Sequence, residues 1–123
     1  FDSRKKKVFA VQKMIESLEI KNVHVVHGRG EELSKKKRWS KRFPYITSRA
    51  VAPMINIVNW TKNLRSDKSI LHIFKGGEIE EEIIFLSNKI SGLKIKKSLM
   101  NLKGYTKLAE NQKYLISLEF NYD

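Results

Sequence analysis

The chain has 123 residues, which is enough for one domain with a single hydrophobic core. Lys and Arg number 25 against 13 Asp and Glu, and the net charge of +12 favours a polyanionic partner such as RNA, DNA or an anionic membrane surface. Cysteine is absent and the three His lack zinc-ligand spacing, which excludes a disulfide framework and a thiolate metal site.

The apolar runs and the first residues of the chain indicate where the protein works and whether it is complete. No apolar run approaches the roughly 18 to 20 residues that span a bilayer, and no signal peptide is recognisable, so we expect a cytoplasmic protein without a membrane or metal partner. The first residues, Phe1 and Asp2, resemble the end of a β-strand whose beginning lies outside the sequence. We therefore expect part of a longer protein.

An amphipathic helix is predicted from Arg4 to Glu19, where apolar residues recur at three- and four-residue spacing: Val8, Val11, Ile15 and Leu18. Ser3 is the expected N-cap. The β-branched run from Val23 to Val26 then predicts a short, buried parallel strand. A basic stretch, Ser34 to Arg42, follows without a clear period.

Two further strand and helix units follow. Tyr45 to Ser48 is typical of a buried strand, and a helix is predicted from Pro53 to about Leu64. Ile70 to Phe74 is the next strand, and the acidic segment 78–88 predicts another helix. Because strand and helix alternate, the pattern favours βαβ crossovers and a parallel sheet. Two last apolar segments predict a closing antiparallel strand pair: Leu93–Leu99 and Tyr114–Phe120.

Four motifs, in this order, resemble the glucose-inhibited division protein B family (GidB, also called RsmG), the bacterial 16S rRNA guanine-N7 methyltransferases. The motifs are "DSRKKK", "HGRGEE", "SRAVAP" and "FKGG". Each one alone is weak, but their order along strand and helix elements makes them specific together. The resemblance runs from Asp2 to the end of the chain.

The resemblance implies an α/β, Rossmann-like class I fold that uses S-adenosyl-L-methionine (SAM). The chain would begin at the second strand of this fold. Its sheet would be mostly parallel, closed by an antiparallel pair of strands. Residues 1–123 would then form a single partial methyltransferase domain, without the family's first strand and its glycine-rich cofactor turn. The chain by itself is therefore expected to bind SAM poorly. The implied activity is methylation of guanine N7 in 16S rRNA of the small ribosomal subunit.

The resemblance also assigns cofactor-binding residues near the start of the chain. Asp2 follows the expected second strand, where an acidic side chain accepts hydrogen bonds from ribose hydroxyls. Ser3 and Arg4 match the same stretch of the family. The alternative is that Asp2 and Ser3 only cap the following helix. Gly30 and Glu31 occupy the place where the family holds adenine, with Gly30 replacing the usual Ala; their alternative is an ordinary surface turn.

Arg49, within "SRAVAP", completes the implied cofactor set. It follows a strand at the edge where open α/β folds bind ligands, and its guanidinium suits the cofactor carboxylate or an RNA phosphate. The alternative is a structural ion pair between Arg49 and either Glu31 or Glu32.

Two places are expected to contact the RNA substrate. The family places the turn of Lys75 and Gly76 beside the target base, and the alternative is a helix-entry turn with a solvated Lys. Arg38 and Trp39 lie in the basic stretch, where cations beside an aromatic side chain can hold phosphates and stack on a base. The alternative for this stretch is a solvated loop.

No catalytic residue is assigned. Guanine N7 carries a free lone pair and no proton, so methyl transfer requires proximity and alignment rather than a general base. His24 and His27 receive no chemical role. The partner implied is 16S rRNA, and we expect a monomer. The competing hypothesis is a non-enzymatic basic module that binds rRNA with the second half of the same fold.

Overall fold

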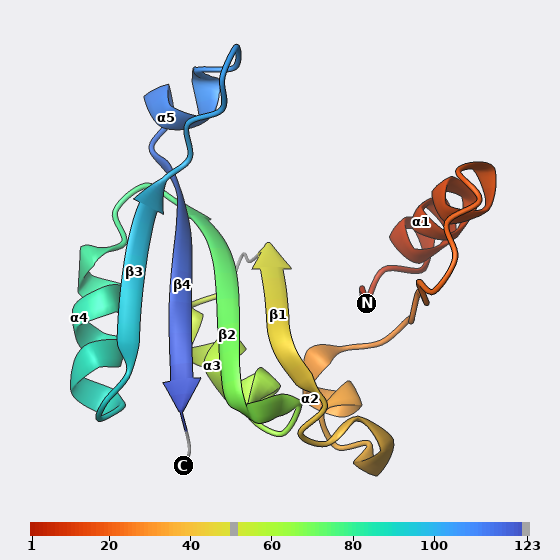
Figure 1. Cartoon of the computed structure of the whole chain (residues 1–123), viewed down its shortest axis with the longest axis horizontal. Helices are drawn as coiled ribbons and strands as arrows, with labels where there is room; N and C mark the ends of the chain where they lie inside the picture. The colour runs from red at the N-terminus through yellow and green to blue at the C-terminus, as the bar shows by residue number, and fades with distance from the viewer. Residues whose placement is uncertain (50–51, 122–123) are drawn as a thin grey trace.

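The computed structural model describes residues 1–49 and 52–121. Its centre is a four-stranded sheet in the order β1-β2-β4-β3 (Figure 1). β1 and β2 are parallel, whereas β4 is antiparallel to both β2 and β3. The predicted parallel crossover and closing antiparallel pair are therefore both present. The strand bounds are Phe43–Arg49 (β1), Arg65–Gly76 (β2), Lys94–Leu99 (β3) and Lys113–Asn121 (β4).

Two helices connect the strands and cover one face of the sheet. α3 (Met54–Thr61) joins β1 to β2, and α4 (Glu80–Lys89) joins β2 to β3. α3 ends at Thr61 rather than near Leu64, where the chain turns into β2. The Thr61 hydroxyl donates a hydrogen bond to the carbonyl of Ile57, 2.8 Å away, within the last turn. We call the covered face the inner face.

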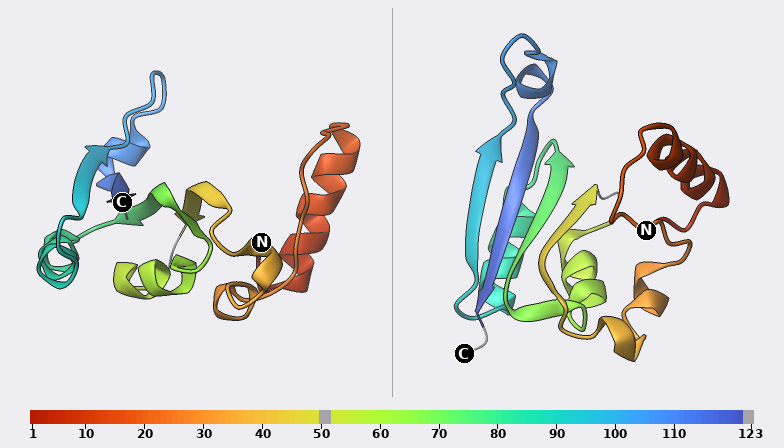
Figure 2. Two further views of the ribbon diagram at one scale, coloured as in Figure 1. Left: turned by 60° about the horizontal axis from the view of Figure 1, so that its bottom comes forward. Right: turned by 45° about the vertical axis from the view of Figure 1, so that its right-hand side comes forward.

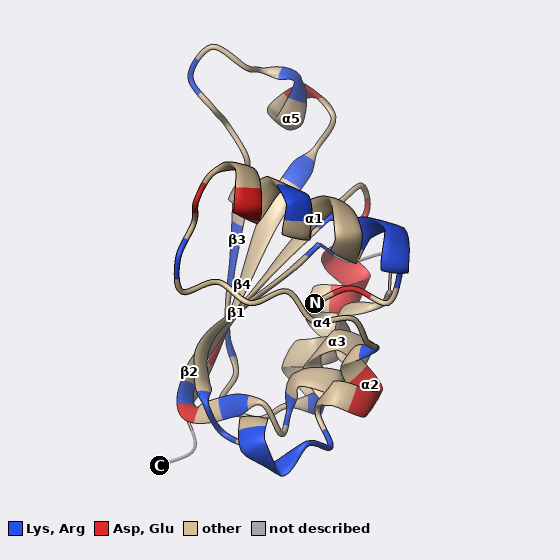
Figure 3. Ribbon diagram, turned by 90° about the vertical axis from the view of Figure 1, so that its right-hand side faces the viewer, with Lys and Arg blue, Asp and Glu red and all other residues tan. Residues whose placement is uncertain are grey.

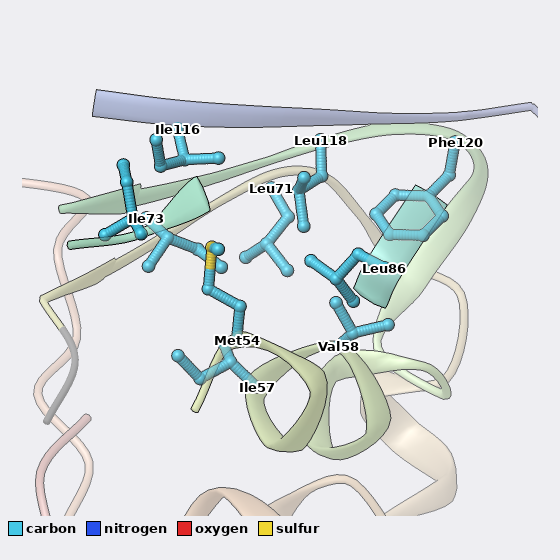
Figure 4. Close-up of a cluster of buried hydrophobic side chains, with 10 residues drawn as sticks. Met54, Ile57, Val58, Leu71, Ile73, Leu86, Ile116, Leu118 and Phe120 are labelled. Carbon is cyan, nitrogen blue, oxygen red and sulfur yellow. The ribbon is translucent and has the colours of Figure 1, made fainter. Parts of the chain in front are cut away.

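The hydrophobic core lies between these helices and the inner face (Figure 4). Alternate residues of β2 and β4 point into it, as the two-residue period of a strand requires. Full burial of one such aliphatic side chain contributes about 1.5–3 kcal/mol to folding. The buried members of the core are Met54, Ile57, Val58, Leu71, Ile73, Ile79, Leu86, Ile116, Leu118 and Phe120.

The opposite, outer face of the sheet is less well covered. Ile70 and Leu115 are only partly buried there, and Phe74 is 36% exposed. His72 Nδ1 and Ser117 Oγ lie 2.9 Å apart between β2 and β4 on this face. Parallel strands are normally covered on both faces. The outer face therefore exposes apolar side chains in the way expected of a sheet face that another layer covers.

The N-terminal region is built differently. α1 (Lys5–Ser17) stands beyond the edge of β1 (Figures 1 and 2), and none of its residues is buried. Two short helices precede the sheet: α2 (Gly30–Leu33) and the 3-10 turn η1 (Lys37–Trp39). Leu33 is 2% exposed. The predicted helix after Asp2 is confirmed, but its apolar side chains have no packed core beneath them.

The strand predicted at Val23–Val26 is wrong in the described chain. This segment has no regular secondary structure, and the residue after it, His27, forms an isolated parallel bridge with Asp2. Asp2 N–H donates to the carbonyl of Val26 at 3.2 Å, and Gly28 N–H donates to the carbonyl of Asp2 at 3.0 Å. A β-branched run becomes a strand only where a neighbour supplies a ladder, and Asp2 supplies a single bridge.

Candidate functional site

The carboxyl ends of β1 and β2 meet at one edge of the sheet, where Arg49 lies opposite Phe74. A cavity of about 440 Å³ opens at this edge. Cationic and apolar side chains line it together, an arrangement that suits a flat ligand carrying an anionic group. The lining residues are Arg49, Phe74, Lys75, Gly76, Met100, Leu108, Lys113 and Tyr114.

Arg49 is an exposed cation of this cavity, as is Lys113. Across residues 1–49 and 52–121, no salt bridge joins Arg49 to Glu31 or Glu32. The alternative of a structural ion pair with these carboxylates is therefore not realised. A guanidinium at the end of a strand, facing a cavity, is placed to bind a carboxylate or a phosphate.

Lys75 is held inside the protein rather than solvated. Its side chain is 13% exposed, and its Nζ lies 2.9 Å from Glu82 Oε1 and 3.2 Å from the carbonyl oxygen of Ala52. Glu82 Oε2 also accepts a hydrogen bond from the backbone N–H of Met54, at 2.8 Å. Lys75 and Glu82 thus link the end of β2, residue 52 and the first turn of α3.

Glu82 was missed by the sequence analysis. It lies in the acidic first turn of α4, where a favourable interaction with the helix dipole already explains a carboxylate. The hydrogen bond to Met54 spans 28 residues, so only the tertiary structure reveals it. Glu82 supplies the cap that Pro53, the N-cap residue of α3, cannot provide from its own side chain.

The Lys113 side chain crosses close to Gly76. A Cβ atom built at Gly76 would lie 2.6 Å from Lys113 Nζ and 2.9 Å from Lys113 Cδ, so the flexible end of this exposed lysine would have to shift. Gly77 instead has a positive φ of 78°, which L-residues with a side chain rarely adopt. The two glycines therefore let the chain turn out of β2 while Lys113 lies across Gly76 beside the cavity.

Tyr114, on β4, lines the cavity next to Lys113. The Lys97 ammonium lies 4.8 Å from the centroid of its ring and also pairs with the Glu80 carboxylate. The hydrogen bond with Glu80 raises the pKa of Lys97 above its ordinary value. Lys97 is therefore a cation at neutral pH and orients the ring of Tyr114 by a cation–π contact.

Asp2, Ser3 and Arg4 form a second group, next to the Asp2–His27 bridge. Asp2 Oδ1 accepts a hydrogen bond from the backbone N–H of Arg4 at 2.8 Å. The expectation that Ser3 is the N-cap is wrong, because Arg4 holds that position and the helix has no side-chain cap. The Ser3 carbonyl lies 3.0 Å from His27 Nε2 instead. The Asp2 carboxylate thus orders the entry to α1.

Gly30 and Glu31 begin α2 directly after this bridge. A Cβ atom at Gly30 would meet the Phe1 ring at 3.6 Å and Trp60 Cβ at 3.7 Å, which are ordinary van der Waals distances. The Ala that is usual in the resembling family would therefore fit here. The candidate residues therefore form two groups. One group lies near the Asp2–His27 bridge and comprises Asp2, Ser3, Arg4, Gly30 and Glu31. The other group comprises Arg49 and the turn of Lys75.

Arg38 and Trp39 lie at the opposite edge of the sheet from this cavity. They precede the start of β1, and Lys41 N–H donates to the carbonyl of Asn63 at 2.8 Å in the turn before β2. β1 has seven residues, so roughly 20 Å separates its two ends. The Arg38 guanidinium lies 4.8 Å from the centroid of the Trp39 ring. The structure does not bring these residues to the Lys75 turn.

Basic residues are spread over both edges of the sheet (Figure 3). Over the part of the chain that the structure describes, no helix is long and apolar enough to cross a membrane. No group of three or more His, Cys, Asp or Glu among the same residues is arranged to hold a metal ion.

Comparison with known proteins decides the family. The family model of GidB, described as rRNA small subunit methyltransferase G, matches residues 1–112. The chain belongs to the GidB family. The resemblance read from the four motifs is thereby confirmed, and the match includes both groups of candidate residues.

Individual relatives agree with this assignment. A GidB-family protein of Thermotoga maritima, named ribosomal RNA small subunit methyltransferase G, is 36% identical over 95 residues, which are 76% of this chain and 39% of the relative. A protein of the same name from Thermoanaerobacter sp. (strain X514) is 33% identical over 82 residues, 67% of this chain. The chain spans about a third of the length of that relative, 34%.

A solved structure shows the same fold. The crystal structure of M. jannaschii TYW2 in complex with AdoMet matches with a TM-score of 0.59 at 9% identity, and the match covers 95% of this chain and 53% of that one. The expected α/β fold of class I SAM-dependent methyltransferases is therefore confirmed. The described sheet of this GidB-family chain contains one parallel and two antiparallel strand pairs, so it is mixed rather than mostly parallel as expected.

Proposed function

We propose that the chain is part of a SAM-dependent methyltransferase domain that methylates guanine N7 in 16S rRNA of the small ribosomal subunit. The observation that carries this proposal is the GidB family match over residues 1–112. The relatives named above are ribosomal RNA small subunit methyltransferases. We further propose that the protein works in the cytoplasm, as a monomer and without a metal ion.

The cofactor is proposed to bind between the two groups of residues at the carboxyl edge. Asp2 would accept hydrogen bonds from the ribose, with Ser3 and Arg4 beside it. Gly30 and Glu31 would hold the adenine, and Arg49 would bind the carboxylate. These residues fit such a ligand because Arg49 is exposed at the cavity and Gly30 leaves room at the start of α2. TYW2, whose fold is similar, was crystallised with AdoMet.

The proposal that residues 1–123 are a partial domain is supported by three surfaces. Among residues 1–49 and 52–121, β1 pairs with β2 on one side only, which leaves its other edge open to a further strand. The Asp2–His27 bridge has the parallel direction of such a sheet. The outer face of the sheet and α1 expose apolar side chains, as with Phe74 and Phe9. A segment that fills this space would complete the cofactor pocket.

The proposed reaction needs orientation more than acid–base chemistry. SAM, when bound, would supply a sulfonium methyl group; transfer to the lone pair of guanine N7 would break the S–CH3 bond, leave a neutral thioether and place the positive charge on the methylated base. The chain's residues would fix the base in the cavity, where Phe74 and Tyr114 offer apolar surface. Lys75 acts by holding Ala52 and Glu82 in place rather than as a free cation. Gly76 lets Lys113 lie close to the entering base.

The RNA contact proposed for Arg38 and Trp39 belongs to the opposite edge of the sheet. Binding there requires RNA that extends around the side of the molecule. Trp39 is partly buried and already lies under Arg38 and Lys36, which restricts base stacking. If Trp39 contacts RNA, Trp39→Ala lowers the affinity severalfold, and an unchanged affinity rejects this contact.

The proposed function is tested by methyl transfer. Labelled SAM and small-subunit RNA without the modification are mixed with the longest chain that the gene encodes, and the labelled base is identified. We expect label on guanine N7, and at least about tenfold less label with Arg49→Ala. Lys89→Ala, far from the cavity, is the matched control. RNA binding without any transfer would contradict this proposal and support a non-enzymatic rRNA-binding module, the function that the net charge of +12 alone would favour.

A further inference from the structure

The connection between β3 and β4 projects beyond the carboxyl edge of the sheet (Figures 1 and 2). We call this connection, residues 100–112, the β3–β4 arm; it contains the short helix α5 (Lys107–Glu110). Two backbone hydrogen bonds fix its root. Met100 N–H donates to the carbonyl of Lys113 at 2.8 Å, and Gly77 N–H donates to the carbonyl of Gln112 at 3.3 Å. The arm therefore starts against the glycine turn at the end of β2.

The tip of the arm presents large apolar side chains to solvent. Leu102 and Tyr105 form an isolated bridge, and Tyr105 N–H donates to the carbonyl of Leu102 at 2.9 Å. Gly104, with a φ of 80°, closes the turn between them. Leu102 is 53% exposed and Tyr105 is 52% exposed. A tight turn thus holds an aromatic ring outward, where it covers no core.

The charges around this ring are mainly positive. Lys103 and Lys107 are exposed on the arm, and Lys113 lies at its root. The arm's acidic residue, Glu110, accepts a hydrogen bond from the Thr106 hydroxyl at 2.8 Å. Exposed cations beside an exposed aromatic ring are the combination that binds single-stranded RNA, through phosphate contacts and base stacking.

The arm also forms part of the cavity. Met100 and Leu108 line it together with Arg49 and the Lys75 turn. Met100 directly follows β3 and Leu108 lies in α5, so two segments of the arm line the cavity. When the base of one nucleotide enters the cavity, the neighbouring nucleotides of the RNA therefore lie next to the arm.

We propose that the β3–β4 arm binds the RNA strand beside the target nucleotide. Tyr105 stacks on a base next to the target, and Lys103 and Lys107 contact phosphates. This inference rests on the proposed function, because it places the target base in the cavity. Self-association through Leu102 and Tyr105 is disfavoured, because two arms that each carry Lys103 and Lys107 would repel one another.

The test measures binding of small-subunit RNA, by fluorescence anisotropy over a range of salt, to the longest chain that the gene encodes. Tyr105→Ala is compared with Tyr105→Phe, which keeps the ring. Lys103→Gln with Lys107→Gln is compared with Lys89→Gln and Lys94→Gln. These two control lysines are exposed, and they lie at the end of α4 and the start of β3, at the other edge of the sheet. Thermal unfolding confirms that all variants fold.

Tyr105→Ala is expected to weaken binding by about fivefold or more, whereas Tyr105→Phe binds like the original chain. The arm double variant lowers the slope of log affinity against log salt by about 1.4, and the control double variant lowers it less. Arm variants that bind RNA as tightly as the original chain would overturn the arm proposal alone, provided that methyl transfer persists. A change in sedimentation rather than in RNA affinity also overturns it. An original chain that neither binds nor methylates this RNA contradicts the proposed function as well.

Discussion

α3 and α1 are both amphipathic helices, yet only one of them is packed. α3 buries Met54, Ile57 and Val58 against β2 and β4. α1 has a comparable apolar stripe, but it leaves Phe9 64% and Met14 60% exposed and has no buried residue. An amphipathic pattern therefore shows that a helix has a face to bury, and the fold decides whether a partner is present.

The two helices differ because of what lies next to them. α3 crosses between adjacent parallel strands, so the sheet itself covers its apolar face. α1 stands next to the single bridge at His27 and beyond the open edge of β1. The partial-domain proposal made above predicts that the segment completing the cofactor pocket also covers the apolar face of α1.

Two methionines allow the most sensitive test of this comparison. Met54 in α3 is fully buried, and Met14 in α1 is 60% exposed. Met54→Ala is expected to lower the free energy of unfolding by about 2–5 kcal/mol, because it leaves a cavity in the core. Met14→Ala should change it by no more than about 0.5 kcal/mol. Urea denaturation of the 123-residue chain measures both, and equal effects would contradict the difference between the helices.

The start of α3 gives the next largest effect. Glu82→Ala removes the partner of Lys75 and of the Met54 N–H, and should lower the free energy of unfolding by about 1–3 kcal/mol. Glu81→Ala is the matched control, because Glu81 is exposed one residue away in the same turn. Denaturant titration separates them. A similar loss in both variants would mean that only the helix dipole of α4 matters.

Gly30 provides the smallest effect, and it lies in the N-terminal region. Gly30→Ala should raise the free energy of unfolding by about 0.4–1 kcal/mol, because it reduces the entropy of the unfolded chain. The structure leaves space for the methyl group between Phe1 and Trp60. Thermal unfolding measures the change. A destabilised variant would show that α2 approaches Phe1 more closely than the structure indicates.

Hydrogen exchange extends the comparison to whole helices. Amides of α1 should exchange faster than those of α3 in the 123-residue chain, because no buried side chain of α1 must be exposed when it opens. Mass spectrometry after short labelling times measures the difference. In the longest chain that the gene encodes, α1 should become more protected. Equal protection in both chains would show that no further segment covers α1.

The sequence predicted the positions of the strands better than the N-terminal region, although Tyr45–Ser48, expected to be buried, lies in the end strand β1, where Tyr45 is 69% exposed. The alternation around Ile70–Phe74 and the closing antiparallel pair formed as expected, because each strand has a neighbour inside the chain. Val23–Val26 did not, since its β-branched residues lack such a neighbour. Arg4 rather than Ser3 became the N-cap because the Asp2 carboxylate binds the Arg4 N–H.

The candidate site was predictable only in part. The motif order pointed to Arg49 and Gly76, and both line the same cavity. The pairing of Lys75 with Glu82 and the position of the β3–β4 arm depend on contacts between distant parts of the chain. Strand periodicity gives the face on which a residue lies, but not which loop covers the end of the sheet.

Calorimetric titration of SAM tests the central claim most directly, that this chain carries one part of a cofactor pocket. The 123-residue chain is compared with the longest chain that the gene encodes, and each is also measured with Asp2→Asn. We predict measurable binding by the longest chain, binding at least about tenfold weaker by the 123-residue chain, and a loss on Asp2→Asn in the longest chain. Equal affinity of the two chains, or no effect of Asp2→Asn, would contradict the account.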